Sequence, residues 1–294
     1  MQRKLVQMGK HTLMVTIPSK WIKRHNLNKG DQVNFSEVEN TLVLRSNKEI
    51  YEKKTSIHLS SSSIELVWRM LQPAYTSGYD ELELTYKDPK TLATIQGCMP
   101  WMLGFEIVET QKNKLLIKSI SKQLDTEFPI ILQRCFHILS QMGIIMNEIL
   151  QKRDFSRLKE IQNLEFSINK YTMFCKRVIN RTGYKYPHYS YMVVVFLELA
   201  ANHIEYIRRY IEREKRKIKI EKEVQKEFSK IPILIANVHS LYVNYSNEEF
   251  VEIAELQPHF KWFEKIKDTE LRFNMKTLAE YLVQIARQTA ALNL

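Results

Sequence analysis

The stretch LMVTIPSKWIKRHNLNKGD, residues 13–31, decides the fold of the amino-terminal part of this chain. Its apolar, partly β-branched run up to Ile17 has the period of two that predicts a β-strand. Pro18 ends that strand and can begin a helix, because proline lacks the N–H that a first helical turn leaves without a partner. The segment SKWIKRHNL, residues 19–27, is then predicted as a short helix, and Gly30 allows a turn after it.

Further predicted strands flank this segment on both sides. Residues 33–35 (VNF) and 41–44 (TLVL) surround residues 38–40 in the manner of a β-hairpin. With one more strand at the start of the chain, residues 3–46 predict the order strand, strand, helix, turn, strand, strand. About 47 residues cannot bury a large hydrophobic core alone, which limits the stability of such a module as a single chain.

This order of elements resembles the AbrB/MazE/SpoVT family of swapped-hairpin DNA-binding domains. The residues that carry the resemblance are Arg3-Lys4, Gly9, Val15-x-Ile17-Pro18, Leu27-x-Lys29-Gly30-Asp31 and Leu42-Val43-Leu44. In that family two chains interleave their hairpins into one barrel. The resemblance therefore implies that residues 1–47 form a swapped-hairpin β-barrel in an obligate homodimer, which would bind double-stranded DNA with two-fold symmetry.

Positive charge is concentrated in the same region. Residues 1–54 contain 11 Lys and Arg against 5 Asp and Glu, whereas residues 55–120 contain 6 against 7. Clustered cations bind the phosphate backbone of DNA by releasing its counterions. The predicted DNA-binding residues are Arg3, Lys4, Lys10, His11, Lys20, Lys23 and Arg24, with Asn26 as a further donor. The alternative is a solvated basic surface, and neither interpretation specifies a base sequence.

Length and composition exclude several classes of protein. A chain of 294 residues with 44% hydrophobic residues is expected to contain two or three domains. No uncharged apolar run approaches 18 residues and no signal-peptide pattern is present, so neither a membrane span nor secretion is predicted. Three cysteines without a CxxC motif favour reduced thiols in the cytoplasm. Because no phosphate-binding loop or nucleophile–base pattern occurs, no enzymatic activity is predicted.

Residues 48–121 are predicted to form a small α/β connector domain. Strands are expected at residues 56–59, 81–85, 105–109 and 114–118, and helices at 64–74 and 90–99. The order βαβαββ favours a small sheet with helices on one face. Trp68 and Trp101 are expected to pack against this sheet rather than to stack on nucleic-acid bases.

Residues 122–294 are predicted to form an all-α bundle. Apolar residues recur at intervals of three and one from Phe128 to Ile149, which indicates a helix with one buried stripe. Further helices are expected at residues 158–182, 187–211, 230–246, 247–266 and 269–291. The connections between the first three helices are short, which favours antiparallel neighbours.

Within this half, residues 195–212 (VFLELAANHIEYIRRYIE) resemble the helices of PhoU proteins, which are associated with the control of phosphate uptake. The signature of those proteins is Glu-x-x-x-Asp on a helix, often followed by His. Here Glu198, Asn202 and His203 occupy these positions, Glu165 with Asn169 looks like a second copy, and Glu280 with Gln284 resembles the closing helix. The order of the three parts resembles archaeal regulators that join such a DNA-binding head to a PhoU-like tail.

The PhoU resemblance implies metal binding, because Glu-x-x-x-Asp presents two carboxylates on one helix face. In this chain a neutral amide replaces the Asp in all three pairs, so no cofactor is predicted to be required and any metal ion is expected to bind weakly. The candidate ligands are Glu165, Glu198, Asn202, Glu205 and Glu280. The alternative is that these residues are ordinary polar positions beside a bundle core.

The sequence therefore predicts a dimeric, cytoplasmic, DNA-binding transcriptional regulator whose helical tail senses or relays phosphate status. Its expected partners are double-stranded DNA, a second copy of the chain, and a phosphate-transport or signalling protein. An alternative is a signalling adaptor of a phosphate transporter, in which the N-terminal module only dimerises. An antitoxin is disfavoured, because antitoxin tails are usually short and disordered whereas this tail is long and periodic.

Overall fold

The computed structural model describes residues 2–38, 41–46, 52–120, 127–184, 186–214, 220–256, 261 and 263–294. The chain divides into two compact units, Met1–Lys53 and Lys54–Leu294. The predicted domain boundaries at residues 47/48 and 121/122 lie outside the described residues, so the division into three domains stays a prediction.

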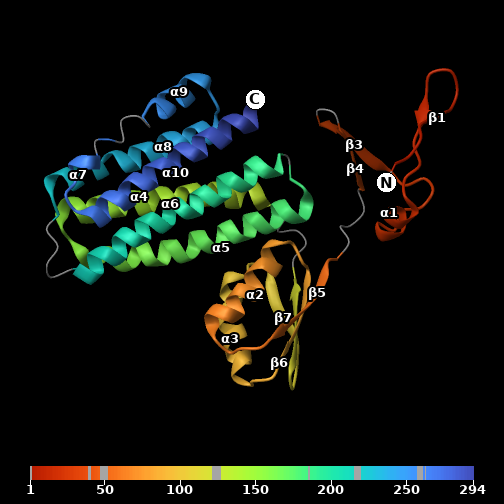
Figure 1. Ribbon diagram of the computed structural model, residues 1–294, viewed down its shortest axis with the longest axis horizontal. Helices are drawn as coiled ribbons and strands as arrows, with labels where there is room; N and C mark the ends of the chain where they lie inside the picture. Colours follow the sequence, from red (N-terminus) through yellow and green to blue (C-terminus); the bar gives the residue numbers. More distant parts are fainter. Residues whose placement is uncertain are drawn as a thin grey trace. The chain divides into compact units, whose positions relative to one another are not determined.

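The N-terminal unit contains two small antiparallel sheets and one short helix (Figure 1). Strand β1 (Val6–Gln7) pairs with β2 (Leu13–Met14), and β3 (Val33–Val38) pairs with β4 (Thr41–Ser46). Helix α1 (Ser19–Arg24) lies between the two sheets in the chain. Glu39 and Asn40, which the sequence places in the hairpin turn, lie outside the described residues.

Two predicted elements of this unit are shorter in the structure. Strand β2 ends at Met14, because β1 offers only two residues to pair with, although the apolar run continues to Ile17. Helix α1 ends at Arg24 rather than at residue 27, since His25 leaves the helical conformation and Asn26 has a φ of 47°. The predicted order of elements is confirmed.

None of the N-terminal residues whose side-chain exposure the structure describes is buried. Large apolar side chains are open to solvent, among them Leu13 at 61% exposure, Phe35 at 57% and Leu42 at 64%. The expected closed barrel is not present in the described part of the single chain, in which β1–β2 and β3–β4 are separate two-stranded sheets. A two-stranded ribbon alone is marginally stable in water.

The second unit begins with a four-stranded sheet. Its strands are β5 (Lys54–Leu59), β6 (Glu81–Tyr86), β7 (Phe105–Gln111) and β8 (Lys114–Ser119), in the order β5-β6-β8-β7. Strands β5 and β6 run parallel and are joined through α2 (Ile64–Thr76), while the other neighbours are antiparallel. Helix α3 (Lys90–Cys98) and the short helix η1 (Met99–Trp101) complete the predicted βαβαββ order.

Alternation along the strands places one face of this sheet in a core. Leu82, Leu84 and Tyr86 of β6 are buried, and the residues between them are half-buried. Helices α2 and α3 lie on one face of the sheet, as predicted (Figure 1).

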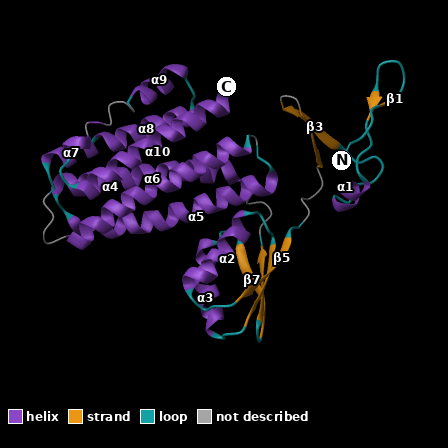
Figure 2. Ribbon diagram, in the orientation of Figure 1, coloured by secondary structure: helices purple, strands orange, loops and turns teal. Residues whose placement is uncertain are grey.

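The rest of the second unit is helical (Figure 2). Its helices are α4 (Phe128–Lys152), α5 (Leu158–Thr182), α6 (Pro187–Glu214), α7 (Lys222–Phe228), α8 (Lys230–Val243), α9 (Asn247–Glu255) and α10 (Thr269–Asn293), with the short η3 (Phe155–Arg157) before α5. Each long helix buries the apolar stripe that its spacing predicts, so one core runs through the bundle. Helix α4 has the length and composition of a membrane span, but its stripe is buried against α5, α6 and α8.

One prediction about the last helices is wrong, and one observed helix is not predicted. Helix α9 ends at Glu255 and does not continue to residue 266; Pro258 in the sequence disfavours a helix before it. Residues 257–260 of that expected helix lie outside the described part of the chain. Helix α7 is not predicted by the sequence, because its seven residues are too few to show a periodic pattern.

Within the second unit, a buried cluster of charged side chains connects the α/β part to the bundle. Asp80, after α2, accepts from Arg177 Nη2 at 2.7 Å and lies 2.9 Å from Arg181 Nε, both on α5. Arg177 also donates to the carbonyl oxygens of Tyr75 and Tyr79. Gly78 allows the close approach, because a Cβ there would lie 3.0 Å from the Cβ of Arg181 and its φ is +81°. The α/β part therefore packs against the bundle as part of one unit.

Candidate nucleic-acid interface

Helix α1 arranges three of the predicted DNA-binding residues on one face. Lys23 and Arg24 lie three and four positions after Lys20, so both share a side of the helix with it. All three side chains are exposed. Trp21 is half-buried and its ring lies 4.4 Å from the ring of His25. The helix thus has a cationic side and an aromatic side.

Local chemistry explains why the helix forms there. Pro18 precedes it in an extended conformation, and its carbonyl accepts from the N–H groups of Trp21 and Ile22. Lys23 and Arg24 occupy the last turn, where the negative end of the helix dipole favours cations. The same residues that stabilise the helix therefore present positive charge.

The turn between β1 and β2 carries two more candidates. Lys10 and His11 are exposed in this turn, which Gly9 enters with a φ of +80°. The N–H of Met8 donates to the carbonyl of Thr12 at 2.8 Å and closes the turn. Arg3 and Lys4 are exposed in the segment before β1.

The cations of this set are available to a ligand. Within the described residues, none of the six Lys and Arg candidates forms an ion pair. Asn26 follows α1 in the left-handed conformation, where Asn is tolerated. Phosphate groups bind such unpaired cations strongly because the bound counterions of DNA are released.

The Lys29-Gly30-Asp31 sequence has a structural role. The Asp31 carboxylate accepts from the N–H of Asn28 at 2.5 Å, and the N–H of Asp31 donates to the Asn28 carbonyl at 3.1 Å. Gly30 takes a φ of +95°, which disfavours any residue with a Cβ. The motif closes the turn between α1 and β3 and so fixes where the second hairpin begins.

Two of the candidate metal ligands, Glu198 and Glu205, are paired with cations. Glu198 on α6 accepts from Lys176 Nζ at 2.6 Å and from Thr172 Oγ1 at 2.8 Å, both on α5. Glu205, also on α6, is buried and accepts from Arg208 at 2.7 and 2.9 Å and from Arg209 at 2.8 Å. These pairs balance the charge that a metal ion would otherwise balance.

The remaining candidates are arranged around different partners. Glu165 accepts from Asn169 Nδ2 at 2.6 Å, and burial, followed by the nearby charge of Glu205, raises the pKa of its carboxyl. Asn202 is half-buried on α6. Glu280 on α10 is half-exposed and lies 4.0 Å from Lys276. The structure thus brings Glu165 near Glu205 but engages Glu198 and Glu280 with lysines.

The neighbouring histidine also has a protein partner. His203 is buried and its Nδ1 hydrogen-bonds to Asn274 Oδ1 at 2.8 Å. Burial lowers the pKa of its imidazole. Within the part of the chain that the structure describes, no group of three or more His, Cys, Asp or Glu side chains is arranged to hold a metal ion. The donor set of the described residues does not fit a metal centre.

The cations that pair with Glu198 and Glu205 are not among the predicted site residues. Arg208 and Arg209 follow Glu205 by three and four positions, so helical spacing alone could identify them. Lys176 lies on a different helix from Glu198, and only the packing of α5 against α6 brings the two together.

Comparison with known proteins finds matches for both parts of the chain. Residues 6–52 match the family described as "Antidote-toxin recognition MazE, bacterial antitoxin", which confirms the predicted MazE/AbrB-like module. No curated protein matches the chain at a significant level. Among solved structures, "Crystal structure of the phosphate transport system regulatory protein PhoU from Streptococcus pneumoniae" is similar at 12% sequence identity and a TM-score of 0.49. That similarity covers 58% of this chain and 95% of that chain.

Proposed function

We propose that this protein is a DNA-binding regulator that acts in the cytoplasm as a homodimer. The match of residues 6–52 to the MazE family is the observation that carries the proposal. The exposed cations of α1 and of the β1–β2 turn supply the phosphate contacts that such a function needs. The DNA-contacting set is Arg3, Lys4, Lys10, His11, Lys20, Lys23 and Arg24.

A second copy of the chain completes the N-terminal unit. Leu13, Phe35 and Leu42 are more than half exposed in one chain. Covering a Leu or Phe side chain stabilises a protein by roughly 1.5–3 kcal/mol, so an interleaved partner would stabilise the unit substantially. A barrel shared by two chains places the two basic surfaces in two-fold symmetry, as a palindromic DNA site requires.

The helical part is proposed to couple DNA binding to phosphate uptake. The Glu-x-x-x-Asn signatures that resemble PhoU proteins support this link, and the expected partner is a phosphate-transport or signalling protein. An effector can regulate only if it binds one arrangement of the protein more tightly than another. The paired Glu198 and Glu205 favour regulation by a partner or organic ligand over regulation by a metal ion.

A signalling adaptor is the second candidate. The exposed apolar residues of the N-terminal unit favour it, because they account for dimerisation without any DNA. An antitoxin is disfavoured by the extensive folded core of residues 54–294.

Selection of genomic DNA fragments by the purified full-length protein, repeated at several salt concentrations, separates the two candidates. A regulator enriches symmetric sites and loses them steeply as salt rises. Phosphate-transport promoters among those sites would support the link to phosphate. A folded dimer that enriches nothing would contradict DNA binding and favour the adaptor.

A further inference from the structure

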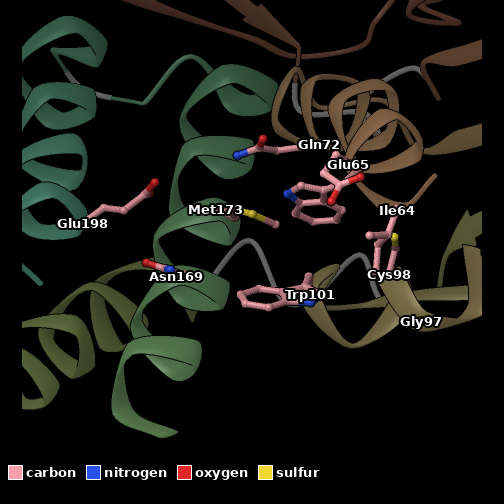
Figure 3. A pocket seen from close by; sticks show the side chains of 10 residues that line it. Ile64, Glu65, Gln72, Gly97, Cys98, Trp101, Asn169, Met173 and Glu198 are labelled. Atoms are coloured by element: carbon pink, nitrogen blue, oxygen red, sulfur yellow. The ribbon is translucent and has the colours of Figure 1, made fainter. Parts of the chain in front are cut away.

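A cavity of about 340 Å³ lies between the α/β part and the bundle (Figure 3). Helices α2, α3 and η1 line one side of it, and α5 and α6 line the other. Its volume is in the range of small-molecule sites. The lining residues are Ile64, Glu65, Trp68, Gln72, Gly97, Cys98, Trp101, Asn169, Met173 and Glu198.

One part of the cavity is aromatic and apolar. The centroids of the Trp68 and Trp101 rings are 6.0 Å apart and the ring planes are tilted by 48° to each other. The two rings therefore form neighbouring, inclined walls of the cavity. Both tryptophans pack against the core of the sheet as predicted, but their remaining surface faces this cavity. Met173 of α5 and Cys98 of α3 add sulfur-containing side chains. Such walls favour a flat apolar group.

The other part contains hydrogen-bond acceptors that lack donors. In Figure 3, Asn169 and Glu198 lie at the opposite end from Ile64 and Cys98. Asn169 donates through Nδ2 to Glu165, and its Oδ1 is buried with no hydrogen-bond partner in the described chain. Lys176 and Thr172 both bind Glu198 through Oε2. A buried acceptor without a donor is costly, so a ligand that donates here gains free energy.

The charge of the residues that line the cavity determines which kind of ligand it favours. Glu65 and Glu198 are the acidic residues of the described lining; Lys176 pairs with Oε2 of Glu198, so the net negative charge of this lining comes from Glu65. The Ser63 hydroxyl hydrogen-bonds to Glu65 and holds the pKa of that carboxyl below its usual value, so Glu65 is ionised at neutral pH. An anion such as phosphate is therefore disfavoured in this cavity, and a cation is favoured.

We propose that this cavity binds a small organic cation, namely a primary amine attached to a flat apolar group. The ammonium group would donate to Asn169 Oδ1 and to the carboxylate of Glu198, while the flat group would lie against Trp68 and Trp101. The cavity belongs to residues 54–294, so the site does not depend on the DNA-binding function of the N-terminal unit.

Calorimetric titration of the full-length protein with phenethylamine tests the site directly. The neutral analogue 2-phenylethanol, the acid 3-phenylpropanoate and inorganic phosphate are the comparison probes. We expect saturable binding of phenethylamine that is about tenfold tighter than that of the alcohol. The acid and phosphate are expected not to bind in the cavity.

Matched variants then identify the cavity as the site. Gly97→Phe should block it, because a Cβ at Gly97 meets no atom within 4 Å and the added ring extends into the cavity; Gly97→Ala is its control. Glu198→Gln should weaken phenethylamine binding about tenfold. The same change at Glu280, which does not line the cavity, should leave it unaltered.

Three results would overturn the proposal. The first is equal affinity of the protein for the amine, the alcohol and the acid. The second is amine binding by Gly97→Phe that is as tight as that of the wild type. The third is the absence of saturable amine binding up to about 10 mM. Circular dichroism of each variant establishes that it is folded. If Glu198→Gln does not fold, Gly97→Phe with its Ala control still decides the question.

Discussion

The two units of this chain differ in how far they bury their apolar side chains. Residues 54–294 enclose large apolar cores, and their buried charges, such as Asp80 and Arg177, are paired. In the N-terminal unit no side chain whose exposure the structure describes is buried, and Leu13, Phe35 and Leu42 are more than half exposed. The second unit thus buries its apolar side chains within one chain, whereas the first leaves several large apolar side chains exposed. In the proposed function, these apolar residues contact a second chain and the basic residues contact DNA.

The largest effect is expected from a charge placed on the apolar surface of the N-terminal unit. Leu42→Asp would put a carboxylate into the shared core, where an unpaired charge is very costly. We expect complete loss of the dimer at micromolar concentration, measured by light scattering after size exclusion. The melting of residues 54–294 should not change, and Leu42→Met should remain dimeric. A dimeric Leu42→Asp protein would locate the dimer interface in the second unit.

The converse experiment disturbs the second unit alone. Asp80→Ala leaves Arg177 and Arg181 buried without their carboxylate, and removing one partner of such a cluster costs about 3–5 kcal/mol. Chemical unfolding of the full-length protein should show this loss of stability. Glu212→Ala, which removes a mostly exposed partner of Arg208, is the control and should cost less than about 1 kcal/mol. Equal losses for the two variants would contradict the buried role of Asp80.

The basic surface gives a smaller and more specific effect. Replacing Lys10, Lys23 and Arg24 with Ala should weaken binding to many DNA sequences and reduce the salt slope by roughly one for each phosphate group that is no longer bound. Lys87, Lys90 and Lys112 are exposed in the α/β part, so their replacement by Ala is a control with the same change in net charge. Fluorescence anisotropy across a salt series measures both. Identical slopes for the two triple variants would remove the first three residues from the interface.

The smallest expected effect is a pH dependence confined to the bundle. His239 lies 4.9 Å from Phe136 in a stacked arrangement, and burial followed by the charge of His137 lowers the pKa of its imidazole. Below the ordinary histidine pKa the unfolded chain binds the proton more readily, so acidification through that value destabilises the fold. We expect His239→Phe to lose less stability than the wild type between neutral pH and pH about 5. Urea unfolding at both pH values checks this, and equal losses would contradict it.

Local sequence patterns predict the helices and strands of this fold, but they do not predict which distant segments pack together. The spacing of Ile64, Val67, Leu71 and Ala74 correctly indicates α2, because a helix brings those positions to one face. Nothing in the sequence indicates that Asp80 meets Arg177, almost a hundred positions later. The same applies to the cavity between Trp68 and Asn169, which exists only once α2 and α5 have packed together.

The candidate site residues can also be predicted from local sequence, but their partners on other helices cannot. The basic residues of the N-terminal unit are predicted from composition and from the VTIP and KGD motifs; they are exposed in the structure, and their contact with DNA stays a prediction. The metal candidates are selected by spacing along single helices. Spacing cannot reveal that Lys176 on another helix binds Glu198, so it overstates the negative charge at that position.

The most direct test of the account is the stoichiometry and salt dependence of DNA binding by the full-length protein. A duplex recovered from the genomic selection is titrated while anisotropy and mass are measured. We expect two chains per symmetric site and an affinity that falls steeply with salt. A folded dimer whose binding to duplex DNA is absent, or does not change with salt, would contradict it.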